Sequence, residues 1–170
     1  MTVSTKLEVY GVKDALKELQ KTDKGLRKEI NESAKAIAQP VTSAAKSNYP
    51  IKYLSGMARP WSFKGRQLFP YDQKKAVKGV VLKIDTSKRN QGLIVIIQKD
   101  PAAAIIDMAG KKGGTGARGA SMIAGLTLHF GQPSRVMWPA YERNAHLVDK
   151  EFRDLVERVM DKVGRNLVTS

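Results

Sequence analysis

Few residues in this chain of 170 amino acids could support catalysis. His129 and His146 are the only histidines, and there is no cysteine. Hydrolytic metal sites need two or three His, Cys or carboxylate ligands at fixed spacings, and a nucleophilic triad needs a base beside Ser or Cys. Neither arrangement occurs, and the carboxylates of Asp107 and Glu142 belong to no recognisable catalytic motif even though their segments could pack together. We therefore expect no enzymatic activity, no metal and no cofactor.

A glycine-rich basic sequence begins at Gly110 and reads Gly-Lys-Lys-Gly-Gly-Thr-Gly-Ala-Arg-Gly. Loops of this kind can hold phosphate, but the nucleotide-binding loop requires Gly-Lys-Ser or Gly-Lys-Thr four residues after its first glycine. That tripeptide is absent, and the dinucleotide-binding fingerprint would need a preceding strand and a following helix. We interpret residues 110–120 as a flexible tip that could become ordered against a neighbouring molecule.

Positive charge is concentrated in the middle of the chain. The formal net charge is +14, and residues 46–90 hold eleven basic side chains against Asp72 and Asp85. The basic residues are Lys46, Lys52, Arg59, Lys64, Arg66, Lys74, Lys75, Lys78, Lys83, Lys88 and Arg89. This distribution is typical of a protein that docks on an acidic partner rather than of a small enzyme with a buried site.

The length and composition predict one folded domain, residues 1–170. A domain usually has about 100 to 200 residues, and 42% hydrophobic residues are enough to form a core. The absence of cysteine excludes a disulfide framework. There is no signal-like N-terminus, and the longest aliphatic run, 93–97, is too short to cross a bilayer, so we expect a soluble, unsecreted chain without a membrane partner.

The N-terminal region predicts a strand followed by helices. Residues 6–10 alternate apolar and polar side chains, which indicates a half-buried edge strand that ends at Gly11. Val12, Leu16 and Leu19 recur at helical spacing. A long helix then follows a cap at Thr22-Asp23, with an apolar stripe of Leu26, Ile30, Ser33 or Ala34, Ile37, Val41 and Ala44. Pro40 lies within it, so the helix should kink or restart there.

Residues 48–71 show neither helical nor strand periodicity and predict a long irregular loop. Prolines and glycines interrupt the segment, and aromatic side chains alternate with basic ones. Such a loop is either a partly ordered surface segment or a contact surface. Two strands should follow, one over 77–84 and one over 93–97, joined through Ser87–Gly92, with the second strand in the interior of the sheet because it is apolar on both faces.

The last third predicts two more helices. Pro101 suits the first position of a short helix over 102–108. A longer helix should begin at Pro139, bury Val148, Phe152, Leu155, Val159 and Val163, and end at Gly164. Its polar face carries equal numbers of acids and bases, with Asp154–Arg158 and Asp161–Arg165 spaced for ion pairs. The predicted fold class is α+β: a small antiparallel sheet packed with a long N-terminal helix, kinked near Pro40, and a C-terminal helix, with long basic loops at 50–75 and 110–120.

The order of four short motifs resembles a known family. They are Gly11-Val-Lys-Asp-Ala-Leu-Lys-Glu-Leu, Ala38-Gln-Pro-Val-Thr-Ser-Ala-Ala-Lys before Pro50, Asp100-Pro-Ala-Ala-Ala-Ile-Ile-Asp-Met-Ala-Gly, and Met137-Trp-Pro-Ala. Together they are similar to the tail-component or tail-completion family of long-tailed bacteriophages, named after the tenth gene product of a lambdoid phage. A proline inside the second helix is typical of that family.

The resemblance implies a structural virion protein that is not an enzyme. Members of the family join the completed tail to the DNA-filled head as a homo-oligomeric ring of six copies at the neck. The expected partners are further copies of the chain and other neck and tail proteins: the connector or stopper, the tail terminator and the tail tube. The expected location is the virion neck, after assembly in the host cytoplasm, with genomic DNA passing close by through the channel.

Contacts between identical subunits of a ring join two different surfaces of the chain, so each subunit needs two complementary regions. We expect the 50–75 and 110–120 loops to be the reaching arms, and deletion of either should leave a folded subunit that does not assemble. The candidate partner or subunit contacts are Lys52, Tyr53, Arg59, Trp61, Phe63, Lys64, Arg66, Lys111, Lys112 and Arg118.

Two alternatives remain open from the sequence. The first is a non-enzymatic nucleic-acid-binding protein whose basic 46–90 region neutralises phosphates. No helix-turn-helix, zinc finger or RNA-binding sheet signature accompanies those charges. The second is a minor tail or assembly protein that acts away from the neck, for which the predicted elements would be the same.

Overall fold

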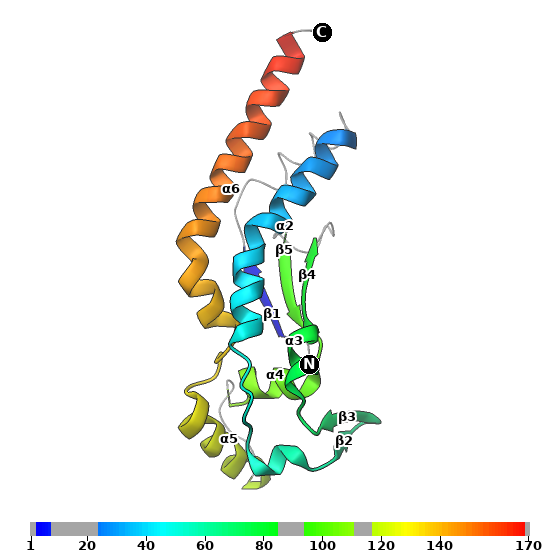
Figure 1. Ribbon diagram of the computed structural model, residues 1–170, viewed down its shortest axis with the longest axis vertical. Coiled ribbons are helices and arrows are strands. Elements are labelled where there is room, and N and C mark those ends of the chain that lie inside the picture. Colours follow the sequence, from blue (N-terminus) through cyan, green and yellow to red (C-terminus); the bar gives the residue numbers. More distant parts are fainter. Residues whose placement is uncertain (1–2, 8–23, 85–93, 111–116, 169–170) are drawn as a thin grey trace.

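The computed structural model describes residues 3–7, 24–84, 94–110 and 117–168, which form an elongated α+β structure (Figure 1). Three layers make up its upper part: a small sheet, the long helix α2 (Lys24–Ser47) and the C-terminal helix α6 (Met137–Val168). A group of smaller elements forms the lower end. The predicted fold class, with one long helix near each end of the chain and an antiparallel sheet, is confirmed.

The sheet has three antiparallel strands in the order β1–β5–β4. They are β1 (Val3–Leu7), β4 (Val80–Ile84) and β5 (Ile94–Gln98). The central position of β5 and the edge position of β1 agree with the predictions, although β1 begins earlier than expected, and Val77 belongs to a helix rather than to β4. The predicted turn at Ser87–Gly92 and the helical spacing over 12–19 lie outside the described residues.

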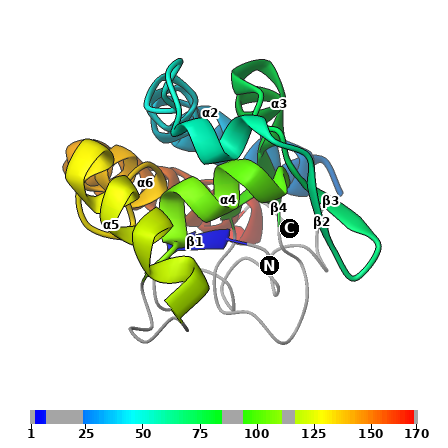
Figure 2. The same cartoon turned by 90° about the horizontal axis from the view of Figure 1, so that it is seen from below.

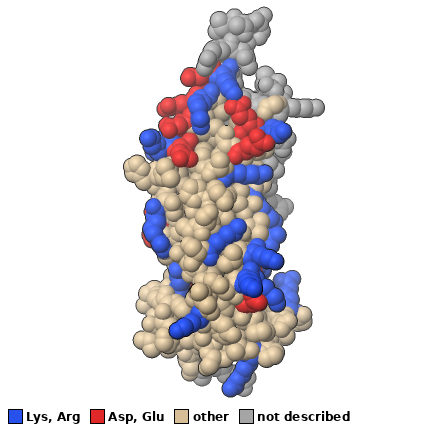
Figure 3. Space-filling view, viewed as in Figure 1, with Lys and Arg blue, Asp and Glu red and all other residues tan. Residues whose placement is uncertain are grey.

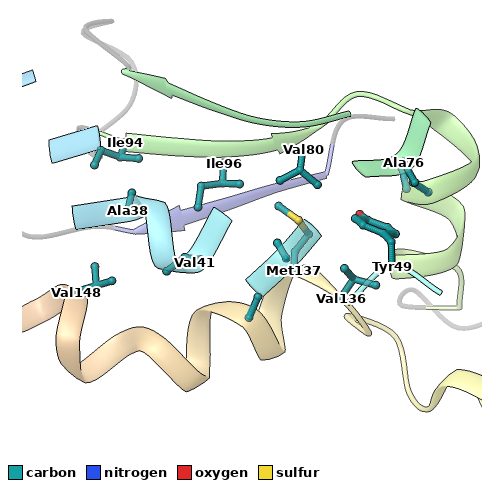
Figure 4. Close-up of a cluster of buried hydrophobic side chains, with 14 of the residues drawn as sticks. Ala38, Val41, Tyr49, Ala76, Val80, Ile94, Ile96, Val136, Met137 and Val148 are labelled. Atoms are coloured by element: carbon teal, nitrogen blue, oxygen red, sulfur yellow. The ribbon is translucent and has the colours of Figure 1, made fainter. Parts of the chain in front are cut away.

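Helix α2 lies between the sheet and α6 and therefore buries two faces. Four of its buried side chains, Ile30, Ala34, Ile37 and Val41, belong to the predicted stripe. Ala38 and Ala45 are buried in addition, while the predicted Ala44 is only partly buried. Figure 4 shows Ala38 and Val41 facing Ile96 of the sheet on one side and Val148 of α6 on the other. Alanine permits this close approach because it brings no bulk beyond Cβ.

The proline in α2 does not interrupt it. The helix is one continuous element from Lys24 to Ser47 with Pro40 inside, so the predicted restart is wrong, whereas Figure 1 shows the axis of α2 changing direction between its two halves. A bend is the expected response to the loss of one backbone donor and to the bulk of the ring. The hydroxyl of Thr42 donates to the carbonyl oxygen of Ala38 at 3.0 Å within the same stretch.

Two helices differ from the predictions near the C-terminus. Helix α6 begins at Met137 and continues through Gly164 to Val168, because a single glycine costs a helix only about 1 kcal/mol and no proline follows. Helix α5 (Ala117–Phe130) occupies a segment for which no helix was predicted. It begins inside the expected 110–120 loop, and its two glycines and nearly uncharged sequence hide the helical stripe.

The expected irregular loop over 48–71 is wrong, because regular elements occupy much of it. A 3-10 helix, Ser55–Ala58, precedes the hairpin of β2 (Trp61–Phe63) and β3 (Arg66–Phe69). Helix α3 (Gln73–Gly79) follows and is capped by Asp72, whose carboxylate accepts from the backbone N–H of Lys75 at 3.0 Å. Helix α4 (Pro101–Met108) has the predicted proline at its start and is capped in the same way by Asp100.

Tight packing joins α3 to the end of β5. The buried Gln98 donates from Nε2 to the carbonyl oxygen of Ala76 at 2.9 Å, and its Oε1 accepts from the N–H of Asp100 at 2.7 Å. A Cβ atom on Gly79 would overlap Oε1 of Gln98 and press on the backbone nitrogen of Asp100. Glycine is therefore required at position 79 by the lack of space.

We predict that Gly79→Ala lowers the free energy of unfolding by about 1 to 3 kcal/mol, the usual cost of overpacking, because Gln98 is held by two hydrogen bonds and cannot move aside freely. Chemical denaturation of the purified chain would measure it. Gly56→Ala is the matched control, because a Cβ at Gly56 has no neighbour within 4 Å. Equal stability of the two variants would contradict the packing argument.

Candidate functional site

The residues considered for catalysis do not come together. His129, His146 and Glu142 have exposed side chains on α5 and α6, whereas Asp107 is buried at the end of α4. Within the described ranges, no group of three His, Cys, Asp or Glu side chains could hold a metal ion. Asp107 makes instead a set of structural hydrogen bonds.

Asp107 organises the start of α6. Its carbonyl oxygen accepts from the N–H groups of Ser134 at 2.7 Å and Arg135 at 3.3 Å. Its carboxylate Oδ1 accepts from the N–H groups of Val136 at 2.7 Å and Met137 at 3.4 Å. Four consecutive backbone donors therefore end on one residue. The first N–H groups of a helix have no acceptor within the helix, so a buried helix start needs such a partner.

The Arg135 side chain also connects the start of α6 to α4, but as a hydrogen-bond donor. Its guanidinium donates to the carbonyl oxygens of Ile106 at 2.9 Å and Ala109 at 3.1 Å, and its Nε donates to the carbonyl oxygen of Gly131 at 2.6 Å. These carbonyls lie at the end of α4 and just after α5, where the helix dipole favours a cation. One side chain thus fixes the ends of two helices. We call Asp107 and Arg135, with the backbone groups they bind, the helix junction.

Burial disfavours the charged form of Asp107. It raises the pKa of this carboxyl above the ordinary 3.8, while hydrogen bonds from Val136, Met137 and Arg135 act in the opposite direction. Oδ2 is buried without a hydrogen-bond partner among the described atoms. The folded chain therefore retains this proton to a higher pH than the unfolded chain.

The projecting hairpin β2–β3 contains the more promising candidate residues. Lys64 and Gly65 form its two-residue turn, with positive φ angles of 50° and 73°, as a type I′ turn requires. The hairpin extends away from the body on the side opposite α5 (Figure 2). Among the described strands, β2 pairs only with β3.

The hairpin holds exposed aromatic and basic side chains together. Trp61 and Phe63 are 51% and 58% exposed, and Lys64 and Arg66 are exposed beside them. Trp61 stacks on Phe69, with ring centroids 5.7 Å apart, and the ammonium group of Lys64 lies 5.6 Å from the centroid of the Phe63 ring. These contacts hold the side chains in place while leaving them open to a partner. We call Trp61, Phe63, Lys64 and Arg66 the hairpin surface.

The other candidate residues lie elsewhere or outside the described part. Lys52, Tyr53 and Arg59 are exposed in the segment before the hairpin, where the Tyr53 ring contacts the Tyr71 ring at 5.5 Å between centroids. Lys111 and Lys112 lie outside the described residues. Arg118 is in the first turn of α5, and its side chain is not described.

The expectation that residues 50–75 form a removable arm is wrong. Met57, Phe69 and Tyr71 are buried in the core, and the Tyr71 hydroxyl donates to the carbonyl oxygen of Pro50 at 2.8 Å. Deleting the whole segment would remove these core side chains, so the folded subunit that was expected from the deletion would not form. Only the hairpin surface projects from this anchored base.

The structure has a groove between α2 and α6 that was not predicted from the sequence. It has a volume of about 560 Å³ and is lined by Ile37, Glu151, Asp154, Glu157, Arg158 and Asp161. The lining therefore consists of four acids, one base and one buried apolar side chain. On α6 these positions are three or four residues apart, which places them on one face, but only the structure shows that α2 completes the groove.

Charge is unevenly distributed along the molecule. In Figure 3 the acidic side chains gather at the upper end, over α2 and α6, where bases also lie, while nearly all coloured side chains at the lower end are basic. Ion pairs among the described residues of α2 and α6 are Lys162–Glu29, at 2.6 Å, Arg153–Asp149, at 3.6 Å, and Lys28–Glu32, at 4.0 Å. The predicted pairing of Arg158 with Asp154 is replaced by a hydrogen bond from Arg158 Nε to the Asp154 carbonyl oxygen.

No protein-family model, curated protein or solved structure matches this chain. Within the part of the chain that the structure describes, no helix has both the length and the apolar character needed to cross a bilayer. The functional interpretation therefore depends on the sequence motifs and on the geometry of the surfaces described above.

We predict that Asp107→Ala lowers the free energy of unfolding by about 2 to 3 kcal/mol, because the buried N–H of Val136 loses a charged acceptor. Asp107→Asn should cost less, since its amide oxygen can still accept. Denaturant unfolding of both variants would measure the difference, and equal losses would contradict a capping role for the carboxylate.

The same pair of chains tests the protonation of Asp107. Because the folded pKa is raised, the stability linked to this carboxyl is fully present below the unfolded pKa and is lost as the pH rises through the folded pKa. The stability of the wild type relative to Asp107→Asn should therefore fall with rising pH in this acidic window and level off above it. Denaturation at a series of pH values would show this, and a rise over that window would contradict it.

Proposed function

We propose that this chain is a structural virion protein of a tailed bacteriophage, a tail-completion component that joins the tail to the head and assembles as a ring at the neck. The observation that carries the proposal is the hairpin surface. It presents two large aromatic side chains and two bases on an anchored projection, which is typical of a protein that binds another protein rather than of one that encloses a substrate.

The four motifs that resemble the tail-completion family support the same function. Three of them fall on elements that build the frame: 38–46 in α2, 100–110 at α4, and 137–140 at the start of α6. The third and fourth motifs supply Asp107 and Met137 of the helix junction. The first motif, 11–19, lies outside the described residues.

The main alternative, nucleic-acid binding through the basic 46–90 region, has less support. On the face in Figure 3 the basic side chains are separated by uncharged surface and do not form a continuous stripe. A stripe along one face is the expected footprint for phosphate binding. We therefore keep the virion protein as the single proposed function.

The first experiment combines mass spectrometry of purified virions with electron microscopy of particles made without this gene. The proposal predicts that the protein is present in virions and that its loss leaves separated heads and tails. Its absence from virions that look normal and remain infectious would overturn the proposal. Virions that contain it but join normally without it would assign it to the tail away from the neck.

We predict that Trp61→Ala/Phe63→Ala prevents joining while the subunit still folds. Loss of an interface aromatic often costs about 2 kcal/mol of binding, whereas loss of the Trp61–Phe69 stack should cost the subunit only about 1 kcal/mol. Complementation of the gene deletion, scored as the fraction of joined particles, and thermal unfolding would measure the two effects. Leu128→Ala is the control, because it removes an exposed apolar side chain of α5 outside the hairpin; equal effects of both variants would contradict a specific role for the hairpin surface.

A further inference from the structure

We propose that the hairpin surface of one copy docks in the α2–α6 groove of a second copy. The inference rests on the proposed function, which requires contacts between copies, and it names the two surfaces that meet. Each copy would offer its hairpin to one neighbour and its groove to another.

The hairpin is suited to enter a partner. Its tip, from Phe63 through the turn to Arg66, has no buried residue, and the turn places Lys64 beside the aromatic ring of Phe63. Half of the Trp61 surface remains in contact with solvent although its ring is stacked on Phe69. Exposed aromatic rings next to bases provide apolar contact area together with a charge that selects an acidic partner.

The groove offers the complementary surface. Glu151, Asp154 and Glu157 supply carboxylates from α6, and Ile37 of α2, which is only 5% exposed, completes the lining. Among the described residues no ion pair involves these three carboxylates. Other acids of α2 and α6 have partners within the chain: Glu29 with Lys162, Glu32 with Lys28 and Asp149 with Arg153. Glu151, Asp154 and Glu157 are therefore the carboxylates that we assign to the contact with a basic partner.

The positions of the two surfaces decide which copy they meet. The hairpin lies at the lower end of the elongated molecule, whereas the groove lies between α2 and α6, which form the long part above it (Figure 1). They cannot touch within one chain, so the contact must join different copies. It is heterologous, as a ring requires, because it joins the hairpin of one copy to the α2–α6 groove of the next.

Salt should weaken this contact, because exposed charges are screened at high ionic strength. The same dependence would accompany binding of the hairpin to DNA, so salt alone does not identify the occupant. The decisive test reverses the charges of both surfaces. If the hairpin binds the groove, reversal of the groove charges should restore association of the charge-reversed hairpin, whereas it should not restore binding of that hairpin to DNA.

The test measures the mass of the purified full-length chain by sedimentation velocity and light scattering at low salt and up to millimolar concentration. Wild type should self-associate. The hairpin variant Lys64→Glu/Arg66→Glu should lose about thirtyfold or more in association constant, the effect of losing one interface hot spot. The groove variant Asp154→Lys/Glu157→Lys should lose a similar amount, and a mixture or a combination of the two variants should associate again.

The matched control is Lys78→Glu/Lys83→Glu, which changes the net charge by the same amount at exposed positions on α3 and β4. It should associate like the wild type. Circular dichroism and thermal unfolding of every variant exclude loss of folding, which is not expected because all the altered side chains are exposed.

Three results would overturn the inference. In the first, the wild-type chain stays monomeric at millimolar concentration. In the second, the hairpin variant associates as strongly as the wild type. In the third, both variants lose association and do not regain it when they are mixed or combined. Binding of monomeric wild type to duplex DNA, abolished in the hairpin variant, would assign the hairpin to nucleic acid. The proposed function is tested separately, by the presence of the protein in virions and by the separated heads and tails that form without it. Failure of the inference is therefore distinguishable from failure of the proposed function.

Discussion

The structure depends on the hydrogen bonds that the buried backbone N–H groups at the start of α6 make. The backbone N–H groups of residues 134–137 all donate to Asp107, and the Arg135 side chain returns to the carbonyl oxygens at the end of α4. Asn48, just beyond α2, adds a hydrogen bond to the carbonyl oxygen of Val136 at 3.1 Å. Since unpaired polar groups are costly inside a protein, these bonds fix where α6 begins and hence how it lies along α2.

This arrangement keeps the two candidate surfaces apart. The layers of sheet, α2 and α6 form a long apolar frame, and the hairpin is attached at its lower end through Phe69, Tyr71 and Met57. The groove forms where Ile37 of α2 meets the acidic face of α6. Alanines at 34, 38 and 45 hold α2 close to its neighbours, so the spacing of the frame and the shape of the groove have the same origin.

The sequence was sufficient for the elements with regular apolar spacing and insufficient where tertiary contacts decide. The stripes of α2 and α6 followed from helical periodicity, the central strand from its continuous apolar run, and α4 from the proline at its start. The β2–β3 hairpin was missed because its strands are short and largely exposed, although Lys64-Gly65 between Phe63 and Arg66 was a readable turn signal. Asp107 was noticed as a carboxylate, but its role depends on residues 134–137, which only the fold brings to it. The groove likewise needs two helices far apart in sequence.

The strand order has a consequence for the chain during its synthesis. Both β1 and β4 pair with β5, and α2 is covered by α6, so the first half of the molecule has no complete core until the last helix is made. Contacts between distant segments form late and slowly, because long loops must close before they contribute. The apolar stripe of α2 therefore cannot be fully buried until nearly the whole chain has left the ribosome. The groove between α2 and α6 is therefore also incomplete until translation is almost finished.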